Sequence, residues 1–220
     1  MSKRLYWILL GVAALSFLGT LALFPSMPVL VPTHWNYRGQ MDSFGPKWIN
    51  LLLAGIPLLV ILGLAVVPKI DPRGENYKKH PKAYAVIAIV LTLSFIAFSW
   101  VITSAAFGYL LPVDKIITIG LGIVFVVMGN FMPQLRSNYF AGFRTPWALA
   151  NEQVWRKTQK AGGIYFVICG ILLIITAFVA HFSETIALMP FIAMLLGVVW
   201  VFIYSYRTFK KIKNSDKTEE

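Results

Sequence analysis

The chain has 220 residues, of which 58% are hydrophobic and only 13% are charged. A soluble domain typically carries about 25% charged residues, so the composition excludes an ordinary soluble protein. The net charge of +11 fits either nucleic acid or anionic lipid as a partner, and the positions of the basic residues decide between the two.

Long uncharged runs dominate the sequence. A bilayer core about 30 Å thick needs roughly 20 apolar residues in a helix. The runs are continuously apolar, whereas the strands of a membrane barrel alternate, so helices are favoured. We therefore expect an all-α fold class, a polytopic membrane protein of about six transmembrane helices. The runs are Leu5 to Phe24, Trp48 to Val67, Ala83 to Thr103, Ile116 to Met132, Gly163 to Ala180 and Ile186 to Tyr204.

The first run follows Lys3 and Arg4, as the apolar part of a signal peptide would. It is longer than the roughly 7 to 15 residues of such a segment, so a retained membrane span is favoured over cleavage.

Basic residues gather in alternate connecting segments. The N-terminus, the loops Pro68 to Lys82 and Pro133 to Gly162, and the tail hold 17 of the 20 Lys and Arg residues. The positive-inside rule then predicts that both termini are cytoplasmic. Because these charges are divided among loops beside membrane spans, membrane lipid is favoured as a partner over direct contact with nucleic acid.

Two loops are long enough to do more than connect helices. In the outer loop, Pro25 to Lys47, prolines exclude a regular helix and Gly39 supplies a turn, so we expect an ordered or extended cap on the outer face. In the inner loop, Thr145 with Pro146 and then Asn151 are helix N-cap signals. They predict a short interfacial helix that leads into the fifth span.

Several spans contain glycines or prolines. Gly122 and Gly129 are seven residues apart, as are Gly163 and Gly170, and this spacing predicts close helix contact. Pro57 lies inside the second span, and the six spans divide into two halves of three, which would have inverted topology. Transporters use both features, so a permease stays an alternative.

No pattern of an enzyme active site is present. The spans contain no Asp, Glu, Lys or Arg, and neither HExxH, GxSxG nor a phosphate-binding glycine loop occurs. Asp42, Asp114, Glu184, His34 and His181 all fall at the predicted outer interface. His34 and Asp42 are too few for a metal site, so a hydrogen-bonded histidine is favoured. We expect no catalysis, no cofactor and no metal.

Three polar residues near the inner loop have two interpretations each. Asn130 either caps or hydrogen-bonds a neighbouring helix or contacts a ligand, and the structural role is favoured. Arg144 and Glu152 either form a salt bridge that shapes the loop or hold a ligand through the guanidinium fork.

Residues at fixed spacings from the fourth to the fifth span form a recognisable pattern: Gly129, Asn130, Phe131, Met132, Pro133, Asn138, Gly142, Arg144, Thr145, Pro146, Trp147, Leu149, Asn151, Glu152, Val154, Trp155, Lys157, Thr158 and Gly162. This pattern resembles the signature of the SdpI family of bacterial toxin-immunity membrane proteins. The chain departs from it at Ala148, where Thr is common, and at Gln159, where His is common.

The outer loop carries a second pattern: Pro28, Pro32, Thr33, His34, Trp35, Asn36, Gly39 and Asp42. It resembles a domain of unknown function that often precedes the SdpI domain. We therefore divide the chain into an N-terminal membrane region, residues 1–110, and an SdpI-like membrane domain, residues 111–220.

The resemblance implies a multi-pass protein of the bacterial cell membrane that binds or neutralises a secreted, membrane-active peptide toxin. It also implies that the protein holds a transcriptional repressor at the membrane. The outer loop is the one sizeable outer surface, so its patterned residues are the expected toxin contacts. The alternatives are a small-molecule permease and a lipid-binding membrane scaffold.

Overall fold

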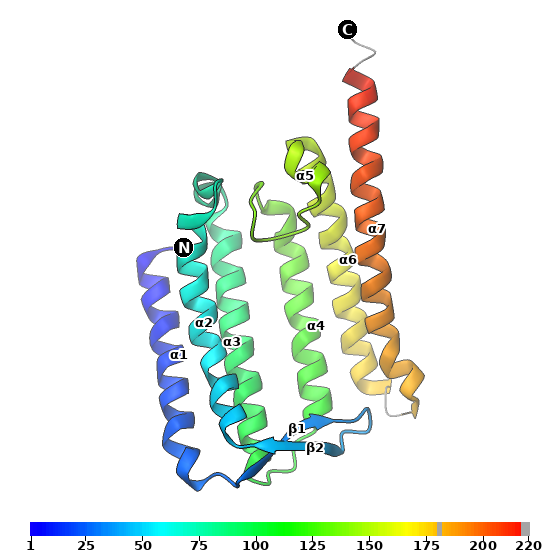
Figure 1. Cartoon of the computed structure of the whole chain (residues 1–220). Coiled ribbons are helices and arrows are strands. Elements are labelled where there is room, and N and C mark those ends of the chain that lie inside the picture. Colours follow the sequence, from blue (N-terminus) through cyan, green and yellow to red (C-terminus); the bar gives the residue numbers. More distant parts are fainter. Residues whose placement is uncertain (180–181, 217–220) are drawn as a thin grey trace.

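The computed structural model describes residues 1–179 and 182–216. Long helices follow one another along the chain, with a two-stranded hairpin after the first and a short helix before the fifth span (Figure 1). The elements are α1 (Lys3–Leu23), β1 (Leu30–Trp35), β2 (Met41–Pro46), α2 (Trp48–Ile70), α3 (Pro81–Ala106), α4 (Val113–Phe131), α5 (Pro146–Ala150), α6 (Glu152–Val179) and α7 (Glu184–Asp216), with 3-10 turns at Phe24–Ser26, Gly74–Lys79 and Met132–Gln134.

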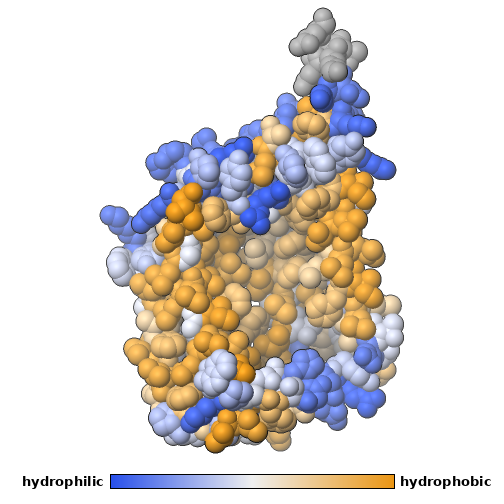
Figure 2. Space-filling view, in the orientation of Figure 1, coloured by the Kyte–Doolittle hydropathy of each residue, from blue (hydrophilic) through white to orange (hydrophobic). Residues whose placement is uncertain are grey.

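The described chain contains six helices long and apolar enough to cross a membrane, namely α1, α2, α3, α4, α6 and α7. Leucines in the middle of these helices point outward, and Leu15, Leu59 and Leu195 are 73%, 69% and 67% exposed. Figure 2 shows the resulting apolar band between two hydrophilic ends. Exposure of large leucines fits a surface solvated by lipid chains, and the prediction of a six-span helical membrane protein is confirmed.

The helices pack in chain order. α1, α2 and α3 contact one another, and α3 also contacts α4. α6 lies between α4 and α7. The contact of α4 with α6 is the most extensive in the bundle. α2 and α7 continue through Pro57 and Pro190, which lie inside them.

Glycines explain the close approach of α4 and α6. A Cβ atom added to Gly163 would lie 2.6 Å from the carbonyl oxygen of Gly129, and one added to Gly170 would lie 2.5 Å from that of Gly122. The two backbones therefore touch where these glycines face each other, as the seven-residue spacing predicts.

The connecting segments divide between two ends of the bundle (Figure 1). The start of α1, the α2–α3 loop, the α4–α6 loop and the end of α7 share one end, which we call the basic end. The hairpin and the α3–α4 connection share the opposite end, which we call the hairpin end. This arrangement places the predicted cytoplasmic segments together, and which end faces the cytoplasm stays a prediction.

Both long loops are ordered. The predicted outer cap is a β-hairpin, so the fold contains one small antiparallel sheet beside its helices. The predicted short helix that leads into the fifth span has two parts: α5 has only five residues, and the segment that begins at Glu152 is the first part of α6 itself. The helix continues because residues 152–163 contain no proline to interrupt it.

Candidate functional site

The hairpin turn is built by Asn36 and Gly39. The Asn36 side-chain oxygen accepts hydrogen bonds from the backbone N–H groups of Arg38 and Gln40, at 2.9 and 3.0 Å. Gly39 has φ +74°, a conformation that other residues rarely adopt, and a Cβ atom there would lie 2.7 Å from a carboxylate oxygen of Asp114. Asn36 and Gly39 therefore shape the turn and bring its tip against the start of α4.

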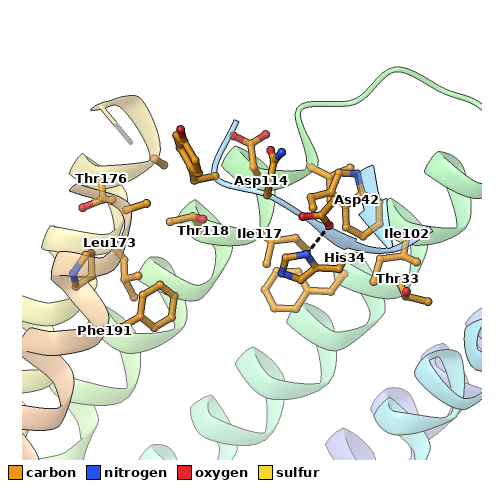
Figure 3. Close-up of a pocket in the computed structure, with 18 of the residues that line it drawn as sticks. Thr33, His34, Asp42, Ile102, Asp114, Ile117, Thr118, Leu173, Thr176 and Phe191 are labelled. Carbon is orange, nitrogen blue, oxygen red and sulfur yellow. Dashed lines mark hydrogen bonds and ion pairs between the residues drawn. The ribbon is translucent and has the colours of Figure 1, made fainter. Parts of the chain in front are cut away.

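The strands place a histidine and an aspartate side by side. His34 Nδ1 and Asp42 Oδ1 are 2.6 Å apart, and both side chains are exposed (Figure 3). Pro32 is buried opposite Phe44, and the strand register shifts between Pro32 and His34. The predicted hydrogen-bonded histidine is confirmed. Among the described residues no group of three or more potential metal ligands occurs.

Buried polar contacts fix the base of the hairpin to the helices. Lys47 Nζ donates to the Phe24 carbonyl oxygen at 3.1 Å, which ties the end of the hairpin to the end of α1. Fully buried Asn50 donates to Thr103 Oγ1 at 2.9 Å, which ties α2 to α3. The hairpin is therefore held at its base and at its tip.

A cavity of about 780 Å³ lies between the hairpin and the helices. Its lining combines the hairpin with α2, α3, α4, α6 and α7 (Figure 3), and Figure 2 shows the apolar surface hollowed between the α1–α3 side and the α6–α7 side. Its deepest residue on α3 is Phe95, eleven residues before the helix ends at Ala106, which corresponds to about 16 Å of helix. The cavity thus reaches toward the middle of the membrane region.

The cavity wall is mainly apolar and its rim is acidic. Phe98, Ile117, Leu173 and Phe191 line the wall. Asp42, Asp114 and Glu184 bring three carboxylates to the rim, whereas the described lining contains neither Lys nor Arg. Apolar walls with a few polar groups are typical of ligand pockets, and the carboxylates favour a ligand with positive charge. His181, also expected at this interface, lies outside the described residues.

Sequence reasoning predicted the hairpin part of this site but missed its helical part. Trp35 and Asn36 line the cavity together with His34 and Asp42, whereas Pro32 and Gly39 do not. Leu173 and Phe191 read as ordinary span residues, because apolar periodicity does not separate lipid-facing positions from cavity-facing ones. The only signal was weak: hydroxyl residues such as Thr118 and Thr176 within the runs.

The basic end contains a buried hydrogen-bond network between the α2–α3 loop and the α4–α6 loop. The Asp71 carboxylate accepts from Tyr77 Oη at 2.7 Å and from the backbone N–H groups of Tyr139 and Arg73 at 2.9 and 2.7 Å. Burial alone would raise the pKa of Asp71, but these hydrogen bonds and the Arg73 charge hold it below its ordinary value. The same burial and the Asp71 contact raise the pKa of Tyr77. The network locks the α2–α3 loop onto the α4–α6 loop.

Asn138 is the centre of the inner loop. It is fully buried, its side-chain oxygen accepts from the backbone N–H groups of Phe140 and Ala141, and its amide donates to the Arg136 carbonyl at 2.9 Å. Gly142 has φ +92° and lies against the Gln159 amide, which in turn holds both backbone groups of Phe143. Gln159, which stands where His is common in the family pattern, thus has a structural role.

Further motif residues lie in packing or capping positions. Thr145 caps α5, contacts Ser205 Oγ at 2.6 Å and precedes Pro146 at the first turn. Asn151 caps α6 through its side chain. Trp147 packs on Tyr206 of α7, with ring centroids 5.0 Å apart. The pattern therefore serves mainly to join α5, α6 and α7.

Trp155 and Pro133 also pack in the region where α4, the inner loop and α6 meet. Trp155 is fully buried and donates to the Leu135 carbonyl at 2.7 Å. The Pro133 ring lies where a Cβ atom on Gly163 would meet it, at 3.1 Å, so it covers the end of the α4–α6 contact.

Of the two interpretations of Arg144 and Glu152, the salt bridge between them is wrong. Arg144 is exposed and donates to the Tyr139 carbonyl at 2.6 Å, whereas Glu152 pairs with Arg136 at 3.7 Å and Arg156 at 3.5 Å. In the described residues no ion pair joins Arg144 to Glu152, because the first turn of α6 turns the glutamate toward Arg156 one turn further on.

The second correction concerns Asn130. Its amide donates to the Val126 carbonyl of its own helix at 3.0 Å and the residue is exposed, so it does not bond a neighbouring helix as expected. A side chain one turn beyond a carbonyl on the same face reaches that carbonyl first.

The architecture defines a multi-pass membrane protein with a hairpin-capped cavity between its helices. Comparison with known proteins agrees with this class. Residues 134–205 match the SdpI/YfhL protein family, and residues 11–61 match a domain of unknown function, DUF1648. The SdpI/YfhL match thus lies in the C-terminal half of the chain, and the DUF1648 match lies before it, near the N-terminus.

One relative resembles the chain over nearly its whole length. The chain is 26% identical over 204 residues to the immunity protein SdpI of Bacillus subtilis (strain 168), and the match covers 93% of this chain and 95% of that protein. No solved structure matches the chain.

Proposed function

We propose that this protein protects a bacterium from a secreted, membrane-active peptide by binding that peptide in the cavity beneath the hairpin. The observation that carries the proposal is the cavity itself, an apolar space of about 780 Å³ that reaches from the hairpin toward the middle of the membrane region. The similarity to a protein named as an immunity protein supports the same role.

The chemistry of the cavity specifies the kind of peptide. An apolar segment of the ligand would replace lipid contacts with contacts to Phe98, Leu173 and Phe191. A cationic side chain or amino terminus would lie near Asp42, Asp114 or Glu184 at the rim, where attraction is strengthened by the apolar surroundings. The absence of a catalytic motif in the sequence fits a binding role.

A cavity-filling substitution tests the proposal. Ile117→Trp on α4 places a large ring in the cavity, while Ile123→Trp on the same helix changes an outward-facing residue that is 51% exposed. Both variants are produced in a sensitive bacterium that is challenged with a panel of membrane-active peptides, and the membrane abundance of each is measured. We expect protection to fall at least tenfold for Ile117→Trp and to stay unchanged for Ile123→Trp. Equal protection by both would contradict binding in the cavity.

A permease is the second candidate function, because Pro190 in the interior of α7 lines the cavity and proline locally loosens a helix. Uptake of the labelled peptide into cells separates the two functions. Binding predicts peptide retained in the membrane fraction, whereas transport predicts its movement across the membrane or release to the medium.

We further propose that the basic end holds a transcriptional repressor, as the family resemblance implies. Exposed Arg144 and half-buried Trp147 give this end a surface for a protein partner. Co-purification of a repressor with membranes only after peptide challenge, and its loss with Arg144→Glu, is the expected result.

A further inference from the structure

A second concavity lies between α6 and α7 at the basic end, with a volume of about 610 Å³. Three lysines line it: Lys157 and Lys160 on α6, and Lys211 on α7. We infer that this α6–α7 groove binds one acidic phospholipid of the membrane leaflet at the basic end.

Within the described part of the chain, these lysines form no ion pair with a carboxylate. No ion pair that the structure describes involves Lys157, Lys160 or Lys211, and the nearby Glu152 is engaged by Arg136 and Arg156. Three ammonium groups that line one small groove repel one another, so an anion bound between them lowers the electrostatic free energy.

The groove is charged at one end and apolar at the other. α6 and α7 run in opposite directions, and Thr158 bonds Ser205 at 3.1 Å, which sets their relative height. Lys157 near the start of α6 and Lys211 near the end of α7 are therefore both at the basic end. Ile164 and Trp200 lie deeper in the membrane region and are 56% and 49% exposed.

This distribution matches the parts of a phospholipid. The phosphate fits the lysine end, where long lysine stems also reach the headgroup level. The hydroxyl of Thr208 and the ring of Tyr204, which stacks on Trp200 at 5.5 Å, lie between the two ends of the groove. Acyl chains fit Ile164 and Trp200. A free phosphate would use only the lysine end, so the apolar half favours a lipid.

Binding is measured on the purified full chain in a zwitterionic detergent, with phosphatidylglycerol as the probe and phosphatidylcholine and glycerol phosphate as comparisons. The test variant is K157Q/K160Q/K211Q. The control is K78Q/K79Q/K82Q, which removes the same charge from exposed lysines at the same end. We expect phosphatidylglycerol affinity to fall at least tenfold in the test variant and less than threefold in the control.

A substitution without any charge change gives an independent arm. Ala161→Phe fills the floor of the groove and leaves every lysine in place, so it should also weaken phosphatidylglycerol binding at least threefold. Equal losses in the two triple variants, or unchanged binding by Ala161→Phe, would overturn the proposal. So would glycerol phosphate that competes as well as the lipid, because the site would then bind phosphate alone.

Discussion

The two ends of the bundle use polar residues in different ways. At the basic end, Asp71, Tyr77 and Asn138 are buried and bonded to one another and to loop backbone. At the hairpin end, His34 and Asp42 are exposed and bonded chiefly to each other beside an open cavity. Buried, satisfied networks fix one structure, whereas exposed polar groups beside an apolar cavity stay available to a ligand. The described contacts thus give the buried network at the first end a role in stability, and the proposed peptide binding belongs to the second end.

Cysteine labelling tests on which side of the membrane each end lies. It has the largest expected effect, because a cysteine either reacts on intact cells or does not. Single cysteines at Tyr37 and Ser183 in a Cys169→Ala background should react with an impermeant thiol reagent on intact cells. Cysteines at Lys79 and Gln153 should react only after the cells are opened, because the positive-inside rule predicts that these basic loops lie on the cytoplasmic side. Strong labelling of the Lys79 variant on intact cells would reverse the orientation and move the cavity to the cytoplasmic side.

Two tryptophans provide the next largest effect. Trp155→Ala removes a fully buried ring and its hydrogen bond at the basic end, and we expect a loss of about 3–5 kcal/mol in stability with low membrane abundance. Trp35→Ala alters a half-buried ring of the cavity lining, so abundance should stay normal while protection against the peptide weakens. Melting temperature and survival are measured for both.

A loss of protection by Trp35→Ala that merely follows reduced abundance would remove the distinction between the two ends. Replacing residues 33–42 with a Gly/Ser linker is the stronger form of the same test. Full protection by that variant would exclude the hairpin from peptide binding.

Two asparagines of the family pattern provide a smaller effect. Asn138→Ala leaves the buried N–H groups of Phe140 and Ala141 without their acceptor, and we expect a loss of about 2–3 kcal/mol. Asn130→Ala removes a contact of an exposed side chain with its own helix and should cost less than about 0.5 kcal/mol. Thermal unfolding in detergent checks both, and similar losses would mean that burial does not separate these residues.

The architecture was largely predictable from the sequence because membrane spans depend on continuous apolar length, which is local. The same holds for the turn at Gly39, the caps at Thr145 and Asn151, and the glycine contacts of α4 with α6. Each rests on a residue type whose geometry allows few alternatives.

The candidate site was less predictable because it depends on which helix faces meet. The cavity takes residues from five helices and the hairpin, and nothing local marks Leu173 or Phe191 as facing inward. The supposed Arg144–Glu152 pair failed for a related reason: Glu152 had two other arginines within reach, and the fold of the loop decided among them.

The smallest expected effect is a pH dependence confined to the basic end. Burial first, and then the positive charges of Arg136 and the N-terminus, lower the pKa of His80 below its ordinary value of 6.5. His80 Nδ1 accepts the backbone N–H of Arg136 at 3.2 Å, which requires that nitrogen to be unprotonated. The unfolded chain therefore binds a proton that the folded chain disfavours, so this contribution to stability is present above about pH 6.5 and declines as the pH falls below it.

Melting temperatures of the purified protein between pH 7.5 and 5.5 test this sign. We expect a decline of a few degrees on acidification in the wild type, a smaller decline for His80→Asn, and the wild-type decline for His34→Asn, whose side chain is exposed at the hairpin end. Asp71 does not interfere in this range, because its lowered pKa places the loss of its contribution below about pH 3.8. If His34→Asn instead flattened the curve while His80→Asn left it unchanged, the pH-sensitive contact would lie at the hairpin, and the assignment of stability to the basic end would fail.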